Sequence, residues 1–235
     1  MNLYENCRLC PRNCSIDRTG GKIGFCGESS TIKAALASVH NWEEPPISGT
    51  KGSGTIFFTG CNLKCVFCQN YSISSEHSGR EISVERLSEI MLEQQARDVH
   101  NINLVTAVHF VPSVIKAVEK ARQNGLTIPI VYNSSGYEKA DTIKMLEGTV
   151  DIYLPDIKYF SSKLSAKYSS APDYFEYASA AVKEMHRQCG NVIFDENGIM
   201  QKGIIIRHLI LPSCKTDSFK ILDWIRDNLG NETYV

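Results

Sequence analysis

Residues 55–70 read TIFFTGCNLKCVFCQN and combine an apolar run with three closely spaced cysteines. The run 55–59 predicts a buried β-strand, and Cys61, Cys65 and Cys68 follow it in a C-x3-C-x2-C spacing. Three thiolates on one loop can bind three irons of a cubane iron–sulfur cluster and leave the fourth iron open, whereas an electron-transfer ferredoxin normally supplies four cysteines. The alternatives are three structural cysteines or a zinc site completed by a distant histidine, and Phe67 directly before the third cysteine argues against both.

The composition is that of a globular protein without a strong net charge. At 235 residues the chain is long enough for one large domain, or for a domain with a small module. The net charge of −1 predicts no bulk attraction to nucleic acid or to an anionic membrane. No run is apolar enough to span a bilayer and residues 1–6 lack a signal-peptide pattern, so we expect a cytoplasmic protein. Nine cysteines in that compartment favour metal or redox chemistry over structural disulfides.

Residues 1–50 differ from the rest of the chain because they are rich in cysteine and glycine and have weak periodicity. Four of these residues are cysteines whose thiolates suit a closed zinc site or a second iron–sulfur cluster, namely Cys7, Cys10, Cys14 and Cys26. A bound metal would help so polar a segment to fold, and the alternative is a loop with free thiols. Residues 43–49 (EEPPISG) predict an extended linker, because a residue before proline is disfavoured in a helix. We therefore divide the chain into an extension at 1–50 and a core at 51–235.

From residue 54 onward the sequence pattern alternates between strands and helices. The strands are predicted at 55–59, 103–108, 128–133, 151–154 and 203–211, and the helices at 83–100, 112–125, 138–146, 172–188 and 218–229. A hairpin is predicted at 192–194 and 199–202, and a sixth strand at 233–235. Repeated β-then-α units imply parallel strands joined by right-handed crossovers. The predicted fold class is α/β, a partial (β/α)6 TIM-like barrel with its chemistry at the C-terminal ends of the strands.

Polar side chains occur at the predicted ends of the second and third strands. Thr106 and His109 follow the second strand and could face a bound cofactor, although His109 is equally well explained as a packed, hydrogen-bonded histidine. Asn133 and Ser134 follow the third strand, and their short polar side chains suit the hydroxyls of a ribose. The alternative for this second pair is an ordinary strand-to-helix turn with a capping serine.

Charged residues mark the ends of the next two strands. Asp156 and Lys158 lie two residues apart, so in a strand they point to the same side, where they could hold a cation and a carboxylate or form a salt bridge. Arg207 interrupts the apolar run 203–211 and needs an anionic or carbonyl partner, because a buried unpaired guanidinium is costly.

The order of these motifs resembles the radical S-adenosylmethionine (SAM) proteins related to pyruvate formate-lyase activating enzyme. The resemblance covers nearly the whole chain and rests on the Cys-rich N-terminus, EEPPISG at 43–49, GSGTIFFTGC at 52–61, IPIVYNSSGY at 128–137 and DIYLPDIK at 151–158. It implies an enzyme of radical SAM type that binds a 4Fe–4S cluster through Cys61, Cys65 and Cys68. Phe67 would then lie near the adenine of SAM.

The same resemblance implies roles for the polar residues at the strand ends. Asn133, Ser134 and Asp156 match positions that line a monovalent cation site in the activating enzyme. Lys158 and Arg207 would face the methionine carboxylate or neighbouring charges. No catalytic residue beyond the cluster ligands is implied.

Three features depart from the activating enzymes. Those enzymes carry Gly-Gly-Glu-Pro after the second strand to hold the methionine amino group, and residues 105–108 (VTAV) stand there instead. The related proteins also usually continue well past a strand like 233–235, and they have a glycine where Ser213 follows Pro212.

The expected activity is reductive cleavage of SAM, followed by hydrogen abstraction from a substrate by the 5′-deoxyadenosyl radical. The expected partners are a one-electron donor of the flavodoxin or ferredoxin type and a glycyl-radical enzyme or peptide, since a barrel that ends at residue 235 would leave a wide lateral opening. Neither nucleic acid nor a membrane is an expected partner. The alternatives are radical modification of a small molecule or peptide, and a non-catalytic iron–sulfur or zinc protein.

Overall fold

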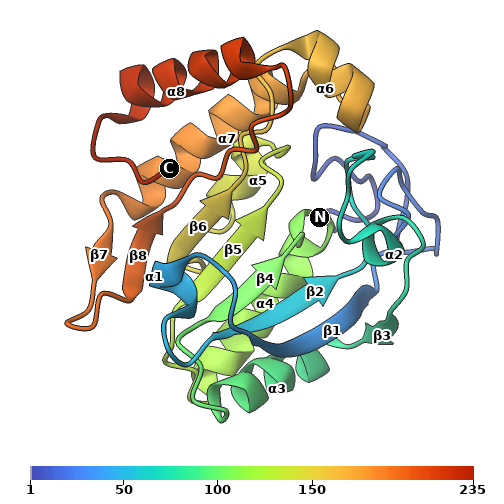
Figure 1. Cartoon of the computed structure of the whole chain (residues 1–235). Helices are drawn as coiled ribbons and strands as arrows, with labels where there is room; N and C mark the ends of the chain where they lie inside the picture. The colour runs from blue at the N-terminus through green and yellow to red at the C-terminus, as the bar shows by residue number, and fades with distance from the viewer. Residues whose placement is uncertain (1) are drawn as a thin grey trace.

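An eight-stranded sheet runs through the computed structural model, which describes residues 2–235 (Figure 1). The strands lie in the order β3-β1-β2-β4-β5-β6-β8-β7. Their bounds are β1 Ile32–His40, β2 Ser53–Phe58, β3 Arg80–Ile82, β4 Ile102–Val105, β5 Ile130–Ser134, β6 Ile152–Pro155, β7 Ile193–Phe194 and β8 Met200–Ile204. The neighbours β2, β4, β5, β6 and β8 are parallel, whereas β1, β3 and β7 pair antiparallel at the two sides.

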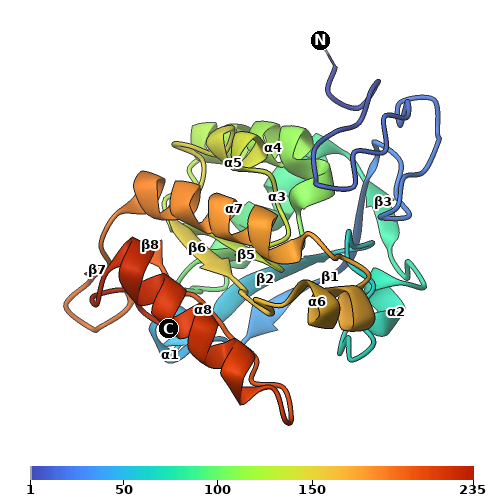
Figure 2. The ribbon, with the colours of Figure 1, turned by 90° about the horizontal axis from the view of Figure 1, so that it is seen from above.

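Helices connect the parallel strands, and four of them, α3, α4, α5 and α7, cover one face of the sheet (Figure 2). The helix bounds are α1 Pro45–Ser48, α2 Tyr71–Ser74, α3 Val84–Gln95, α4 Val111–Gln123, α5 Ala140–Lys144, α6 Ser162–Ser169, α7 Tyr174–Cys189 and α8 Lys215–Leu229, with a 3-10 turn at Val108–Phe110. The arrowheads of the parallel strands point toward α2, α6 and the N-terminal loops (Figure 1). Residues that follow these strands are therefore brought to one end of the sheet.

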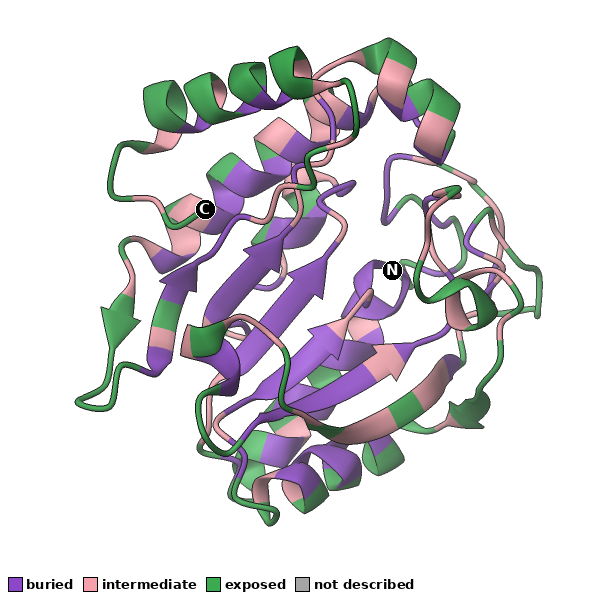
Figure 3. Cartoon of the chain, in the orientation of Figure 1, coloured by how far each residue is buried: buried purple, intermediate pink, exposed green. Residues whose placement is uncertain are grey.

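Side chains alternate between the two faces of the sheet, and most strand residues are buried (Figure 3). Ile130 and Tyr132 belong to the core that packs against the helices. Val131, between them, belongs to a separate cluster with Ile47 of α1 on the opposite face. Asn133 follows the same alternation and shares that opposite face, where it is buried. The helix side is thus an apolar core, while the α1 side carries buried polar groups.

Two predicted helix boundaries are confirmed by local contacts. Ser83 caps α3, because its side-chain oxygen accepts a hydrogen bond from the backbone N–H of Arg86 at 3.0 Å. Pro112 lies in the first turn of α4, where its missing N–H has no helical partner to lose. Gly125, just beyond the end of α4, has a φ of +99°, which glycine adopts without strain.

The segment before residue 50 is more regular than predicted. Residues 32–40 form β1, which pairs with both β2 and β3, so this part of the predicted extension lies in the central sheet. Most β1 residues are only half-buried, and their sequence accordingly lacks a clear alternation. Residues 45–48 form α1 rather than an extended linker, because Pro45 and Pro46 occupy the first turn, which tolerates proline.

The region after residue 190 also differs from its prediction. β8 joins the second predicted hairpin strand to the first two residues of the strand expected at 203–211, and it pairs antiparallel with β7 and parallel with β6. Beyond Ile204 the predicted strand is reduced to isolated bridges at Ile205 and Arg207. Gly203 has a φ of +127°, and a Cβ there would lie 2.8 Å from the Cα of Val192, so the two segments pack closely at this glycine. The predicted sixth strand is a single parallel bridge between Tyr234 and Ile205.

The structure therefore has a mixed α/β fold with a mostly parallel eight-stranded sheet. Three short elements were missed, namely α2, β3 and α6, because each is brief and polar. No helix within residues 2–235 is both long and apolar enough to cross a bilayer.

Candidate functional site

The loop that follows β2 holds the three predicted cluster cysteines, and each sulfur has one hydrogen-bonding neighbour. The backbone N–H of Leu63 donates to Cys61 Sγ at 3.4 Å. Cys65 Sγ lies 2.9 Å from the hydroxyl of Ser169 in α6, and Cys68 Sγ lies 3.2 Å from the hydroxyl of Ser74. We call residues 60–70 the cysteine loop.

Contacts with α6 and with the segment after β5 hold the cysteine loop in place. The side chain of Asn62, which is fully buried, donates to the carbonyl oxygen of Tyr137 at 2.6 Å. The backbone N–H of Val66 donates to Tyr168 O at 2.9 Å. Leu63 and Phe67 pack into a cluster rich in aromatic side chains from α6 and α7. The cysteines are therefore carried on a braced loop at the C-terminal end of a buried strand.

The chemistry of this loop fits a three-cysteine iron–sulfur cluster. Burial raises the pKa of Cys61 to about 12, and the neighbouring Lys158 ammonium opposes the rise, so a bound metal must replace a tightly held proton. Among residues 2–235, no three or more His, Cys, Asp or Glu side chains converge closely enough to hold one metal ion. In a cubane each cysteine binds a different iron, so three cysteines on one loop fit a cluster with one open iron.

Charged residues from β6 and from the end of β8 meet on the α1 side of the sheet. Arg207 Nε lies 3.0 Å from Asp156 Oδ1, and Lys158 Nζ lies 2.5 Å from Asp156 Oδ2. Arg207 also donates to Asn133 Oδ1 at 2.6 Å and to Glu43 Oε1 at 3.1 Å. Arg207 thus has the anionic partner that its position required, and of the two alternatives for Asp156 and Lys158 the structure shows the salt bridge.

The buried charges set the protonation of this network. Burial alone would raise the pKa of Asp156, but Lys158 and Arg207 together hold it below its ordinary value. Burial raises the pKa of Glu43 to about 7 in spite of Arg207. Glu44 Oε2 and Asn103 Oδ1 are buried acceptors without a hydrogen-bond partner. The network thus has spare acceptors and suits a positively charged group.

Sequence reasoning missed three members of this network, Glu43, Glu44 and Asn103. Glu43 Oε2 accepts hydrogen bonds from the side-chain amides of Asn103 at 2.7 Å and Asn133 at 3.1 Å. The available signal was a polar residue, Asn103, on the buried face of a strand. The acidic pair was hidden because residues 43–49 were interpreted as a linker.

The remaining cofactor candidates are one half-buried residue, Thr106, and two buried residues, His109 and Ser134. Thr106 is half-buried at the end of β4, with a φ of +61°, and its N–H donates to Asn133 O. His109 is buried, and its Nε2–H donates to Thr59 O at 2.7 Å. Burial lowers the pKa of His109 to about 3, so the ring is neutral, which matches the packed histidine that we considered. Ser134 Oγ accepts from the N–H of Gly136, as in the alternative of a local turn.

The four N-terminal cysteines lie in one looped segment beside the cysteine loop. Cys7, Cys10 and Cys26 are buried and Cys14 is half-buried, and all nine cysteines of the chain are free thiols. Burial, and to a smaller extent the neighbouring Cys26, Cys14 and Cys7, raise the pKa of Cys10 to about 12.

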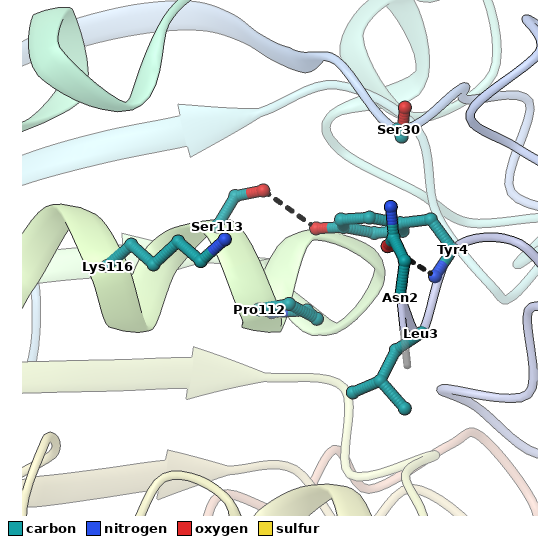
Figure 4. A pocket seen from close by; sticks show the side chains of 7 residues that line it. All are labelled: Asn2, Leu3, Tyr4, Ser30, Pro112, Ser113 and Lys116. Carbon is teal, nitrogen blue, oxygen red and sulfur yellow. Dashed lines mark hydrogen bonds between the residues drawn. The ribbon is translucent and has the colours of Figure 1, made fainter.

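A hollow of about 590 Å³ lies elsewhere, between the N-terminal residues and the start of α4 (Figure 4). Its lining includes Tyr4, whose hydroxyl lies 2.9 Å from the hydroxyl of Ser113. None of the predicted site residues lines this hollow. The polar network and the cysteine loop are therefore the stronger candidate for a functional site.

A loop with three cysteines at the end of the first parallel strand, beside charged strand ends, defines an iron–sulfur protein of the α/β class. The sequence profile of the Radical SAM superfamily matches residues 55–195, which is more than half of the chain. The chain therefore belongs to the Radical SAM superfamily. Membership implies an enzyme that uses a 4Fe–4S cluster and SAM.

Two relatives come from the archaeon Methanocaldococcus jannaschii. The chain is 32% identical over 241 positions to the uncharacterized protein MJ0674, covering 98% of the chain and 64% of the relative. It is 26% identical over 247 positions to the uncharacterized protein MJ0808, covering 97% of the chain and 68% of the relative. The chain thus spans about two thirds of the length of each.

Proposed function

We propose that this protein is a radical SAM enzyme in which Cys61, Cys65 and Cys68 bind a 4Fe–4S cluster with one open iron. When bound, the cluster supplies an electron for the reductive cleavage of SAM, which yields the 5′-deoxyadenosyl radical as the hydrogen-abstracting species. The observation that carries the proposal is the cysteine loop, with a hydrogen-bonding group at each sulfur and no fourth cysteine among residues 60–70.

The protein's own residues would bind and orient the cofactor. Phe67 sits in the partly buried rim of the aromatic cluster, a position suited to contact with the adenine. Lys158 and Arg207 supply positive charge for a carboxylate, while Asp156, Asn133 and Ser134 are candidates for a monovalent cation site. In this proposal, the sheet around them is the partial barrel of radical SAM type.

In this proposal, the acidic pair Glu43 and Glu44 takes the place of the missing Gly-Gly-Glu-Pro in holding the methionine amino group. Glu43, Glu44 and Asp156 carry three carboxylates against the two cations Lys158 and Arg207. With Glu44 Oε2 and Asn103 Oδ1 unpartnered, this excess acceptor capacity favours an ammonium or metal cation in the same network.

The proposed substrate is macromolecular, a glycyl-radical enzyme or another peptide, as in activation of the pyruvate formate-lyase type. Its support is an exposed apolar segment next to the cysteine loop. Leu209 and Ile210 are 49% and 68% exposed, and the adjoining Leu211 packs against the same aromatic cluster as Cys61 and Cys65. Exposed apolar residues at a site rim are typical of protein contacts. The cluster thiolates suit a reducing, cytosolic compartment, and a flavodoxin or ferredoxin would donate the electron.

The test combines product analysis with electron paramagnetic resonance under anaerobic conditions. Reduced, cluster-loaded protein is mixed with SAM and either a glycyl-radical enzyme from the same cell or a pool of small metabolites. Release of 5′-deoxyadenosine with a glycyl-radical doublet supports the full proposal. Release only with metabolites replaces the peptide by a small molecule, and no release under any condition leaves a non-catalytic metal protein.

A further inference from the structure

The N-terminal segment that carries the four cysteines also holds a buried positive charge, Arg18, which has no carboxylate partner among residues 2–235. The Arg18 side chain is 1% exposed, and no salt bridge to it occurs among residues 2–235. Its guanidinium donates to the carbonyl oxygens of Glu28 at 3.1 Å, Ser29 at 2.5 Å and His109 at 2.8 Å. The guanidinium also lies 3.5 Å from Cys7 Sγ and over the rings of Tyr4 and Phe110, at 5.0 Å and 5.8 Å from their centroids. Carbonyl dipoles and aromatic faces solvate the guanidinium, but none of them carries the negative charge that would balance it in a buried place.

Local contacts bring three of the four cysteine segments together. The N–H of Cys7 donates to Ile16 O at 2.9 Å, which brings Cys7 next to the segment that follows Cys14. The N–H of Phe25 donates to Cys14 Sγ at 3.4 Å, which brings Cys14 next to Cys26. A Cβ at Gly24 would lie 3.2 Å from Cys14 Sγ, so the chain passes close to this sulfur.

We propose that Cys7, Cys10, Cys14 and Cys26 bind a second metal centre whose negative charge is compensated by Arg18. Four thiolates around Zn²⁺, or around an oxidised 4Fe–4S core, carry a net charge of about −2, and the guanidinium of Arg18 would offset half of it.

The centre is joined directly to the cysteine loop. The backbone N–H of Cys61 donates to the carbonyl oxygen of Cys26 at 3.3 Å, so a ligand of one site touches a ligand of the other. Arg12, between Cys10 and Cys14, donates to Asn62 O at 2.8 Å and to Ser170 O at 2.7 Å. Loss of the second centre should therefore loosen the first. The inference does not depend on SAM chemistry, because its test measures bound metal alone.

The first experiment counts metal in a full-length Cys61→Ala/Cys65→Ala/Cys68→Ala variant, loaded anaerobically with iron and sulfide or with zinc. About four irons with equal sulfide assign a cluster, and about one zinc without sulfide assigns a zinc site; either result supports the centre. Adding Cys10→Ser to this variant must abolish the binding. A variant that is folded by circular dichroism and metal-free, or one whose metal survives Cys10→Ser, overturns the proposal.

If the multiple variant does not fold, the wild-type chain with Cys10→Ser alone answers the question. Its metal content should fall by one centre relative to wild type, and equal content contradicts the inference.

Arg18→Gln tests the counter-charge, with Arg8→Gln as the control. Arg8 is exposed, and among residues 2–235 its side chain bonds only to the Ser15 hydroxyl. Arg18→Gln should release the second metal faster to a chelator, or shift a cluster's reduction potential to a more negative value. Equal behaviour of the two variants contradicts the role of Arg18.

Discussion

Arg207 and Asp156 link two strand ends, with Arg207 Nε 3.0 Å from Asp156 Oδ1 and a parallel bridge between their backbones. Both side chains are mostly buried, at 28% and 19% exposure. This pair fixes the end of β6 against the continuation of β8, and it places a carboxylate and a guanidinium beside the cysteine loop.

Asp156→Asn should therefore destabilise the fold. The substitution keeps the shape but leaves Lys158 without its carboxylate, and a broken buried pair of this kind costs about 3 kcal/mol. Urea unfolding of the apoprotein measures the loss. Asp141→Asn is the control, because Asp141 pairs with Lys144 on the surface, where such a pair is worth less than about 1 kcal/mol. Equal losses in the two variants would show that Asp156 belongs to a solvent-screened pair.

Glu138 should make stability fall as pH rises. Its carboxyl is buried and accepts a hydrogen bond from the Tyr132 hydroxyl at 2.9 Å, and burial raises its pKa to about 7 from the ordinary 4.5. Between these values the folded protein holds a proton that the unfolded chain has lost. The stabilisation is complete below pH 4.5 and is lost as pH rises through 7.

Glu138→Gln should remove this dependence. From pH 5 to pH 8, wild type should lose up to about 3 kcal/mol relative to the variant, in which the amide stays neutral. The exposed Glu119→Gln substitution is the matched control and should run parallel to wild type. Parallel stability curves for Glu138→Gln and wild type would mean that Glu138 is charged in the folded protein.

Thr106 should store backbone strain at the end of β4. A β-branched residue at a φ of +61° is unfavourable, whereas glycine adopts this conformation freely. Thr106→Gly should be about 1 kcal/mol more stable than Thr106→Ala, which keeps the Cβ that causes the strain. Thermal unfolding of the two variants makes the comparison. If Thr106→Gly is less stable than Thr106→Ala, the positive φ of Thr106 does not strain the backbone.

Ser169 should tune the proposed cluster through its 2.9 Å contact with Cys65 Sγ. A hydroxyl that donates to a cluster sulfur stabilises the reduced state, so Ser169→Ala should shift the reduction potential to a more negative value. Ser165→Ala is the control, one turn earlier on the same helix, because its hydroxyl bonds Ser162 O instead. A redox titration of the loaded protein reads the potential. Matching shifts in both variants would rule out the sulfur contact as the cause.

The sequence predicted the parallel strands and the cysteine loop well, because both depend on local pattern. The apolar runs that became β5 and β6 are fully buried, and β2 is buried apart from Phe57. The spacing of Cys61, Cys65 and Cys68 lies within one loop. The caps at Ser83 and Pro112 likewise need only neighbouring residues. The charge of Arg207 inside an apolar run was enough to predict an anionic partner.

Contacts between distant segments could not be read in the same way. Glu43 meets Arg207, which is far away in the sequence, and no local pattern connects a proline-rich turn with a strand end. The burial of Arg18 depends on carbonyl groups from three separate places in the chain. β1 has the mixed exposure of a strand near the sheet edge, and it becomes evident only through its pairing with β2.

The most direct test of the account is the release of 5′-deoxyadenosine from SAM by the reduced, cluster-loaded protein. Wild type should release it, and so should Cys214→Ala, which alters a half-buried thiol outside the cysteine loop. Cys68→Ala should release none, because three cysteines leave no spare ligand. Cleavage by Cys68→Ala at the wild-type rate, with an unchanged spectrum of the reduced cluster, would contradict the assignment of the cysteine loop.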